Sequence, residues 1–160
     1  MNENITNDMI CEAVSQVLAD MAFIFTEPAP AHLPWNDDVL TAHLPFAGRQ
    51  RGTLILSTTT SLCAEIAANL LGSDAAADYD PGHFCDSWGE IANVVGGVLM
   101  EKAYGTNLIC HLGIPQVSPP REEAQIELPR TALYVSLLDD EWRRIDAAVI
   151  LEPMAQAVGE

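Results

Sequence analysis

Apolar residues recur at helical spacing in three segments of the chain. The first runs from about residue 7 to 25, the second from about 61 to 71, and the third from about 83 to 104. Apolar positions three to four residues apart place one apolar side of an α-helix against a core. Gly105 follows the third segment at the position of a helix C-cap. The pattern therefore predicts three amphipathic helices.

Short segments rich in β-branched and other apolar residues lie between and after these helices. Two of them flank a turn around Gly48 and predict a hairpin, and four more follow the third helix. The six predicted strands are 39–45, 52–58, 108–112, 124–128, 132–138 and 144–151. We expect surface loops at 73–82 and 121–123 and a flexible tail after about 152. Together these elements predict an α+β fold, with an antiparallel or mixed sheet covered on one side by about three helices.

The third predicted helix carries polar residues on the side opposite its apolar stripe. At about 100° per residue, Asp86, Glu90 and Asn93 fall within an arc of roughly 60°. Gly97 lies one turn further along the same face and has no side chain, so that another surface can approach closely. Ordinary solvation explains most such faces. The arrangement nevertheless indicates a contact face directed at a partner.

The spacing of these residues extends to a proline further along the chain. Asp86 is followed after three residues by Glu90, after two more by Asn93, and after another 21 by Pro115 in Gly113-Ile114-Pro115. This pattern resembles the signature of the CheC/CheX/FliY family of response-regulator phosphatases. The order of predicted elements is also similar to that family over nearly the whole chain. The resemblance implies hydrolysis of the aspartyl phosphate of a CheY-like receiver domain in two-component signalling.

The same resemblance implies roles for individual residues. Asn93 would orient the attacking water through its amide, and Glu90 would pair with a lysine of the receiver. Asp86 and Gly97 would belong to the partner-binding face, and Pro115 would shape the loop after a strand. The receiver would bring its own Mg²⁺, so that this chain needs no cofactor of its own. A homodimer paired through sheet edges is implied as well.

The first predicted helix carries a similar set of polar residues. Asp8, Glu12 and Ser15 repeat the later spacing with serine in place of asparagine. A hydroxyl lacks the combined carbonyl acceptor and N–H donors of an amide, and we interpret this set as a degenerate copy of the motif. It indicates an internal duplication, with coincidence as the alternative. Because CheC-type members carry two motifs and CheX-type members one, the chain is most similar to CheX.

Composition limits the partners and the compartment. We expect one domain across residues 1–160, because 160 residues with 49% hydrophobic content suit one compact core. Seven Lys and Arg against 23 Asp and Glu give a formal net charge of −16, which argues against nucleic acid or anionic lipid as the main partner. No leader pattern or apolar stretch of bilayer length is evident, so we expect a cytoplasmic protein and no membrane partner. The cysteines lack C-x-x-C spacing, and we expect reduced, mostly buried thiols.

Other kinds of chemistry have weaker support in the sequence. His83 with Cys85 and Cys110 with His111 are candidates for a four-ligand metal site. Their spacing matches no common zinc module, and neighbouring residues of a strand point to opposite faces. The sequence has no glycine-rich phosphate loop, G-x-S-x-G or H-E-x-x-H motif. We therefore expect no metal held by this chain.

Two other functional classes remain open. One is a non-catalytic binding module of the same fold, which would dock a receiver without dephosphorylating it. The other is an unrelated sensory or structural protein whose acidic face matches the motif by chance. Glu90 and Asn93 are both intact, which argues against the first. Failure to bind any receiver domain would support the second.

Overall fold

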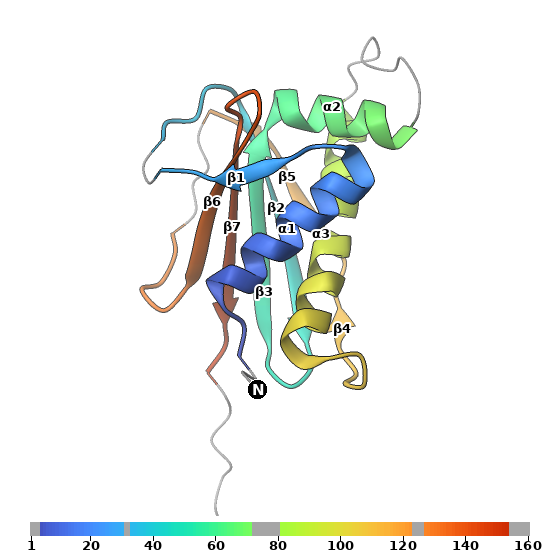
Figure 1. The fold of residues 1–160 in the computed structure, drawn as a ribbon, viewed down its shortest axis with the longest axis vertical. Helices are drawn as coiled ribbons and strands as arrows, with labels where there is room; N and C mark the ends of the chain where they lie inside the picture. The colour runs from blue at the N-terminus through green and yellow to red at the C-terminus, as the bar shows by residue number, and fades with distance from the viewer. Residues whose placement is uncertain (1–3, 31–32, 72–80, 123–126, 154–160) are drawn as a thin grey trace, which may run out of the picture.

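The structure, a computed structural model, describes residues 4–30, 33–71, 81–122 and 127–153. These residues form three helices and seven strands (Figure 1). The helices are α1 (Asn7–Ala22), α2 (Thr60–Leu71) and α3 (Pro81–Tyr104). The strands are β1 (Thr26–Pro28), β2 (Val39–Ala47), β3 (Gly52–Thr59), β4 (His111–Leu112), β5 (Gln116–Arg121), β6 (Leu133–Asp139) and β7 (Arg144–Leu151).

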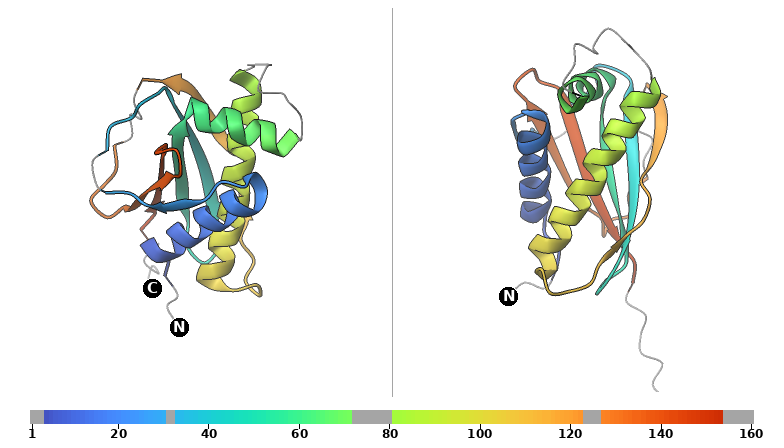
Figure 2. Two further views of the ribbon diagram at one scale, coloured as in Figure 1. Left: turned by 45° about the horizontal axis from the view of Figure 1, so that its top comes forward. Right: turned by 90° about the vertical axis from the view of Figure 1, so that its right-hand side faces the viewer.

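All seven strands belong to one antiparallel sheet. Its order is β1-β6-β7-β3-β2-β4, and β5 also pairs with β2. The three helices lie on the same face of this sheet (Figure 2). The predicted α+β arrangement is therefore confirmed, and the sheet is antiparallel rather than mixed.

The connectivity also confirms the predicted internal duplication. One unit consists of α1, β1, β2 and β3, and the other of α3, β5, β6 and β7. Strands β3 and β7 pair at the centre, while β1 pairs with β6 and β5 pairs with β2. In this comparison β1 corresponds to β5, β2 to β6 and β3 to β7. Exchanging each strand with its counterpart turns the order β1-β6-β7-β3-β2-β5 into its reverse, so the same strands remain paired. The sheet thus has the pseudo-twofold symmetry that a duplicated helix-and-strands unit produces.

The main core lies between the helices and the sheet. Trp88 of α3 is fully buried, and its indole N–H donates to the backbone carbonyl of Leu56 at 3.0 Å. Ile91 and Val95 are also fully buried on the same side of α3. The apolar stripe predicted for this helix is therefore its core-facing side, which turns the opposite face outward.

The boundaries of two helices differ from those predicted. Helix α1 ends at Ala22, since Phe23 adopts φ 56° and its N–H donates to the Ala19 carbonyl at 3.2 Å. Helix α3 begins at Pro81, so residues 81 and 82 are helical rather than loop. Proline is tolerated in the first turn of a helix because its missing N–H needs no partner there. Residues 73–80 of the predicted loop lie outside the described residues.

The predicted strands around the second unit need further correction. Only His111–Leu112 of the predicted strand 108–112 pairs with β2. Residues 26–28 and 116–121 form strands that the sequence did not predict, so that Arg121 ends β5 rather than lying in a loop. Residues 127 and 128 are not in a strand, and the rest of the predicted strand 124–128 lies outside the described residues. The predicted tail from 154 onward lies outside them as well.

Other expectations have mixed outcomes. The sequence predicted reduced, mostly buried thiols. All four cysteines are free, but only Cys63 is fully buried, and Cys11, Cys85 and Cys110 are half-buried. One sheet edge is formed by β1, which has three residues, and the other by β4 and β5, which have two and six residues. The homodimer implied through sheet edges stays a prediction. Within the described ranges, no helix has the length and apolar character needed to cross a membrane.

Candidate functional site on helix α3

Two glycines bring α3 close to the elements around it. A Cβ atom added at Gly96 would lie 2.4 Å from Cδ2 of the buried Leu44 in β2. A Cβ atom at Gly89 would lie 3.4 Å from Cγ2 of Val117 and 3.6 Å from Cβ of Pro115. The helix is therefore packed directly on β2 and on the segment that leads into β5, and Pro115 lies beside α3.

The predicted contact residues all lie on the outward side of α3. Asp86, Glu90 and Gly97 are exposed, and Asn93 is half-buried. A Cβ atom added at Gly97 would meet no other atom within 4 Å. The structure thus brings the four residues together on one accessible face, with an open position one turn beyond the amide.

Across from these residues, a loop forms the second side of an open depression. The depression has a volume of about 570 Å³, and Asp86, Glu90 and Asn93 line it from α3. Cys85 and Gly89 also line it from α3, and the other side is formed by Gly113, Ile114, Pro115 and Val117. The 84% exposed Ile114 was not predicted as a site residue. Its only sequence signal is its place between the glycine and proline of the motif.

Among the described residues, the polar side chains of this face have no partner. Within the described part of the chain, Asp86, Glu90 and Asn93 make no side-chain hydrogen bond and no ion pair. The similar set on α1 is partly engaged. Glu12 pairs with Lys102 of α3 at 3.7 Å, and the Ser15 and Thr26 hydroxyls lie 2.9 Å apart in a hydrogen bond. The face of α3 is therefore the one with its acidic and amide groups available to a partner.

Cys85 lines the same depression but is poorly suited to act as a nucleophile. Burial raises the pKa of its thiol, and the neighbouring Asp86 raises that pKa further. The thiolate is the reactive form of cysteine, and a raised pKa keeps the thiol protonated near neutral pH. The site can bind and orient groups through carboxylates and an amide, and covalent catalysis by Cys85 is disfavoured.

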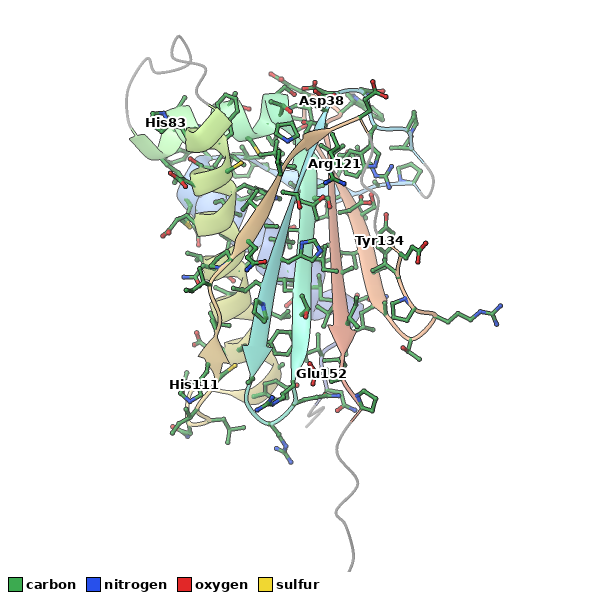
Figure 3. All side chains as sticks on the ribbon, turned by 180° about the vertical axis from the view of Figure 1, so that it is seen from behind. Asp38, His83, His111, Arg121, Tyr134 and Glu152 are labelled. Carbon is green, nitrogen blue, oxygen red and sulfur yellow. The ribbon has the colours of Figure 1, made fainter. Side chains whose placement is uncertain are left out.

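The alternative metal site is contradicted by the structure. His83 and His111 lie at opposite ends of the molecule (Figure 3). His83 and Cys85 belong to the first turns of α3, whereas Cys110 and His111 lie at and just before β4. A single ion cannot bridge residues placed this way. Elsewhere in the described ranges, no group of three or more His, Cys, Asp or Glu residues is arranged to hold a metal.

Comparisons with known proteins identify the family and the fold. The family model described as "Chemotaxis phosphatase CheX" matches residues 40–135, a range that includes all of α3 and the depression beside it. A search of curated proteins finds no match.

Solved structures of chemotaxis proteins share the fold at low sequence identity. CheX of Vibrio vulnificus is 18% identical, with a TM-score of 0.74 over 91% of this chain and 95% of that one. CheX in the CheX–CheY–BeF3–Mg²⁺ complex of Borrelia burgdorferi is 16% identical, with a TM-score of 0.71 over 94% and 100%. FliY of Thermotoga maritima is 10% identical, with a TM-score of 0.59 over 91% and 87%. At these identities the likeness establishes the fold alone.

Proposed function

Because this chain belongs to the CheX family of chemotaxis phosphatases, we propose that it hydrolyses the aspartyl phosphate of a phosphorylated CheY-like receiver domain. The observation that carries the proposal is the exposed face of α3, where Glu90 and Asn93 stand at the motif spacing with no partner inside the described chain. The solved complex of a CheX with CheY, BeF3 and Mg²⁺ supports a receiver as the partner. The family assignment also argues against an unrelated protein with a chance motif.

The proposed reaction is the displacement of aspartate from phosphorus by water. The water oxygen forms a bond to phosphorus while the bond between phosphorus and the carboxylate oxygen breaks, which releases phosphate and restores the receiver aspartate. Such a step depends mainly on an in-line water and on stabilisation of the phosphoryl charge. The Mg²⁺ expected on the receiver would neutralise part of that charge.

The groups on α3 fit the positioning part of this chemistry. The amide carbonyl of Asn93 accepts a hydrogen bond from the attacking water, and its NH₂ group donates to a phosphoryl oxygen. Glu90 lies one turn earlier and forms an ion pair with a receiver lysine, which sets the position of the helix along the receiver. Asp86, another turn earlier, contacts the rim. Neither carboxylate is required to remove a proton in this mechanism.

The experiment that tests the proposal is a phosphate-decay assay. Receiver domains from the same organism are phosphorylated, and loss of the phosphoryl group is followed with and without this protein. We expect faster decay for at least one receiver. Binding to a receiver without faster decay would instead support the non-catalytic binding module.

The neighbouring glycines Gly96 and Gly97 offer a matched test of the contact face. We expect Gly97→Ala to raise the free energy of unfolding by about 0.5–1 kcal/mol, because alanine is the better helix former and its Cβ meets open space. The same variant should dephosphorylate more slowly, since the added methyl group lies where a partner surface approaches. Urea unfolding and the decay assay measure the two effects.

The control for this test is Gly96→Ala on the core-facing side of the helix. Its Cβ would overlap Leu44, so overpacking should lower stability by about 1 kcal/mol or more. A Gly97→Ala variant that is more stable and equally active would contradict the placement of the receiver at this face.

A further inference from the structure

A second hollow continues the depression along α3. It has a volume of about 290 Å³. Gly97 and Tyr104 line it from α3, and Leu108 and Ile109 line it from the segment that follows the helix. Asn93 lines the first hollow and Gly97 the second, and these residues are one helical turn apart. On the opposite side, Leu112 lines the second hollow and its chain neighbour Gly113 lines the first. The two hollows therefore adjoin as one strip between α3 and residues 108–117.

Residues 108–117, which form the side of the strip opposite α3, carry exposed aliphatic side chains. Leu108 is 46% exposed, Ile109 77% and Ile114 84%. The other large hydrophobic residues exposed in the described ranges are all aromatic, namely Phe23, Phe25, Tyr134 and Trp142. Every exposed large aliphatic side chain of the described residues thus lies within 108–114. At such exposures Ile109 and Ile114 add little to the stability of the isolated chain, and a cluster of this kind marks an interaction surface.

Electrostatics gives the reason that an apolar contact is needed here. The chain has a formal net charge of −16, and among the residues that line the strip the exposed Asp86, Glu90 and Glu101 of α3 outnumber one basic residue, Arg49. A receiver presents its acidic phosphorylation site to this helix, so long-range attraction is weak and the single Glu90–lysine pair carries little affinity. Burial of aliphatic side chains at the centre of an interface supplies affinity without charge complementarity.

On this basis, and resting on the proposed function, we propose that Ile109 and Ile114 are docking residues for the receiver domain. They pack against apolar side chains on the rim of its phosphorylation site while Asn93 reaches the phosphoryl group. The receiver would lie along the strip, with Ile114 opposite Glu90 and Asn93 and with Ile109 opposite Gly97. The two isoleucines contribute to binding, and the chemistry stays with the polar groups of α3.

The test separates binding from chemistry by measuring KM and kcat for the receiver that the wild-type protein dephosphorylates. Replacing Ile114 or Ile109 by serine should raise KM about tenfold each, the effect of removing one buried aliphatic side chain from an interface. The kcat at saturating receiver and the unfolding midpoint should stay at wild-type values. Ile114→Val should recover most of the lost affinity. Phe25→Ser is the matched control, because Phe25 is also exposed, at 66%, but precedes β1 on the opposite sheet edge.

The possible results distinguish failure of the docking role of the isoleucines from failure of the proposed phosphatase function. Dephosphorylation by the wild-type protein with unchanged KM in both serine variants overturns the docking role and leaves the proposed function intact. A loss of kcat at unchanged KM overturns it too, because the isoleucines would then position the reacting groups. If the wild-type protein dephosphorylates no receiver, the proposed function fails, and the docking role falls with it.

Discussion

Replacing Asn93 by alanine is expected to lower the acceleration of receiver dephosphorylation by about 10²- to 10³-fold. The amide is the group on α3 that can hold the attacking water and contact the phosphoryl oxygens at the same time. Alanine is a strong helix former, and Asn93 makes no internal hydrogen bond within the described chain, so the fold should be retained. The KM for the receiver should change little, since Glu90 and the exposed isoleucines remain. The phosphate-decay assay at saturating receiver measures the effect.

Two companion variants separate the possible causes of this loss. Asn93→Asp keeps the size of the side chain but replaces the NH₂ donor with a negative charge beside the phosphoryl group, and we expect it to be as inactive as Asn93→Ala. Gln16→Ala removes an exposed amide from α1, and it should be as active as the wild-type protein. Full activity of Asn93→Ala would contradict the proposed mechanism. Full binding with no activity in the wild-type protein would favour the binding module.

Replacing Trp88 by alanine is expected to lower the free energy of unfolding by about 3–5 kcal/mol, the usual cost of truncating a buried aromatic side chain. Trp88 is fully buried, and its indole N–H donates a hydrogen bond to the backbone carbonyl of Leu56 in β3. It lies between Asp86 and Glu90 in the sequence, on the opposite side of α3. A loss of this size is a large part of the stability of an ordinary domain. Urea unfolding gives the number directly.

Trp88 also holds the contact face in place, and graded variants test this. Trp88→Phe keeps most of the apolar volume but loses the N–H, so it should cost less than the alanine variant and leave measurable phosphatase activity. Trp142→Ala is the control, because Trp142 is 69% exposed and surface substitutions usually change stability by less than about 0.5 kcal/mol. Equal losses for Trp88→Ala and Trp142→Ala would contradict the central place of Trp88 in the core.

The contact face of α3 follows from the sequence because helical geometry is local. Once Trp88, Ile91 and Val95 are assigned to the core, the fixed rotation per residue places Asp86, Glu90, Asn93 and Gly97 on the other side. The β2–β3 and β6–β7 hairpins are similarly local, since short turns connect alternating apolar segments. The repeat of the motif at Asp8, Glu12 and Ser15 indicated a duplication with coincidence as the alternative, and the pseudo-symmetric strand pairing favours the duplication.

Strands β1 and β5 were not predicted because their sequences carry little strand pattern. β1 has three residues and ends at Pro28, and β5 contains Pro119 and Pro120, which lack an N–H for the ladder. They are strands because β6 and β2 offer them backbone partners. Pairing of this kind depends on the whole sheet. It cannot be derived from the segment itself.

The sequence by itself determined the helical faces, the motif and the family, because periodicity and spacing are properties of the local chain. Only the tertiary structure decided what lies opposite the motif. Ile114 is 21 residues beyond Asn93, and the close packing of Gly89 and Gly96 brings the two sides of the depression together. The tertiary structure also decided that Glu12 is paired with Lys102 whereas Glu90 has no ion-pair partner among the described residues. Such contacts join residues far apart in the chain, and they exist only when the sheet and helices are assembled.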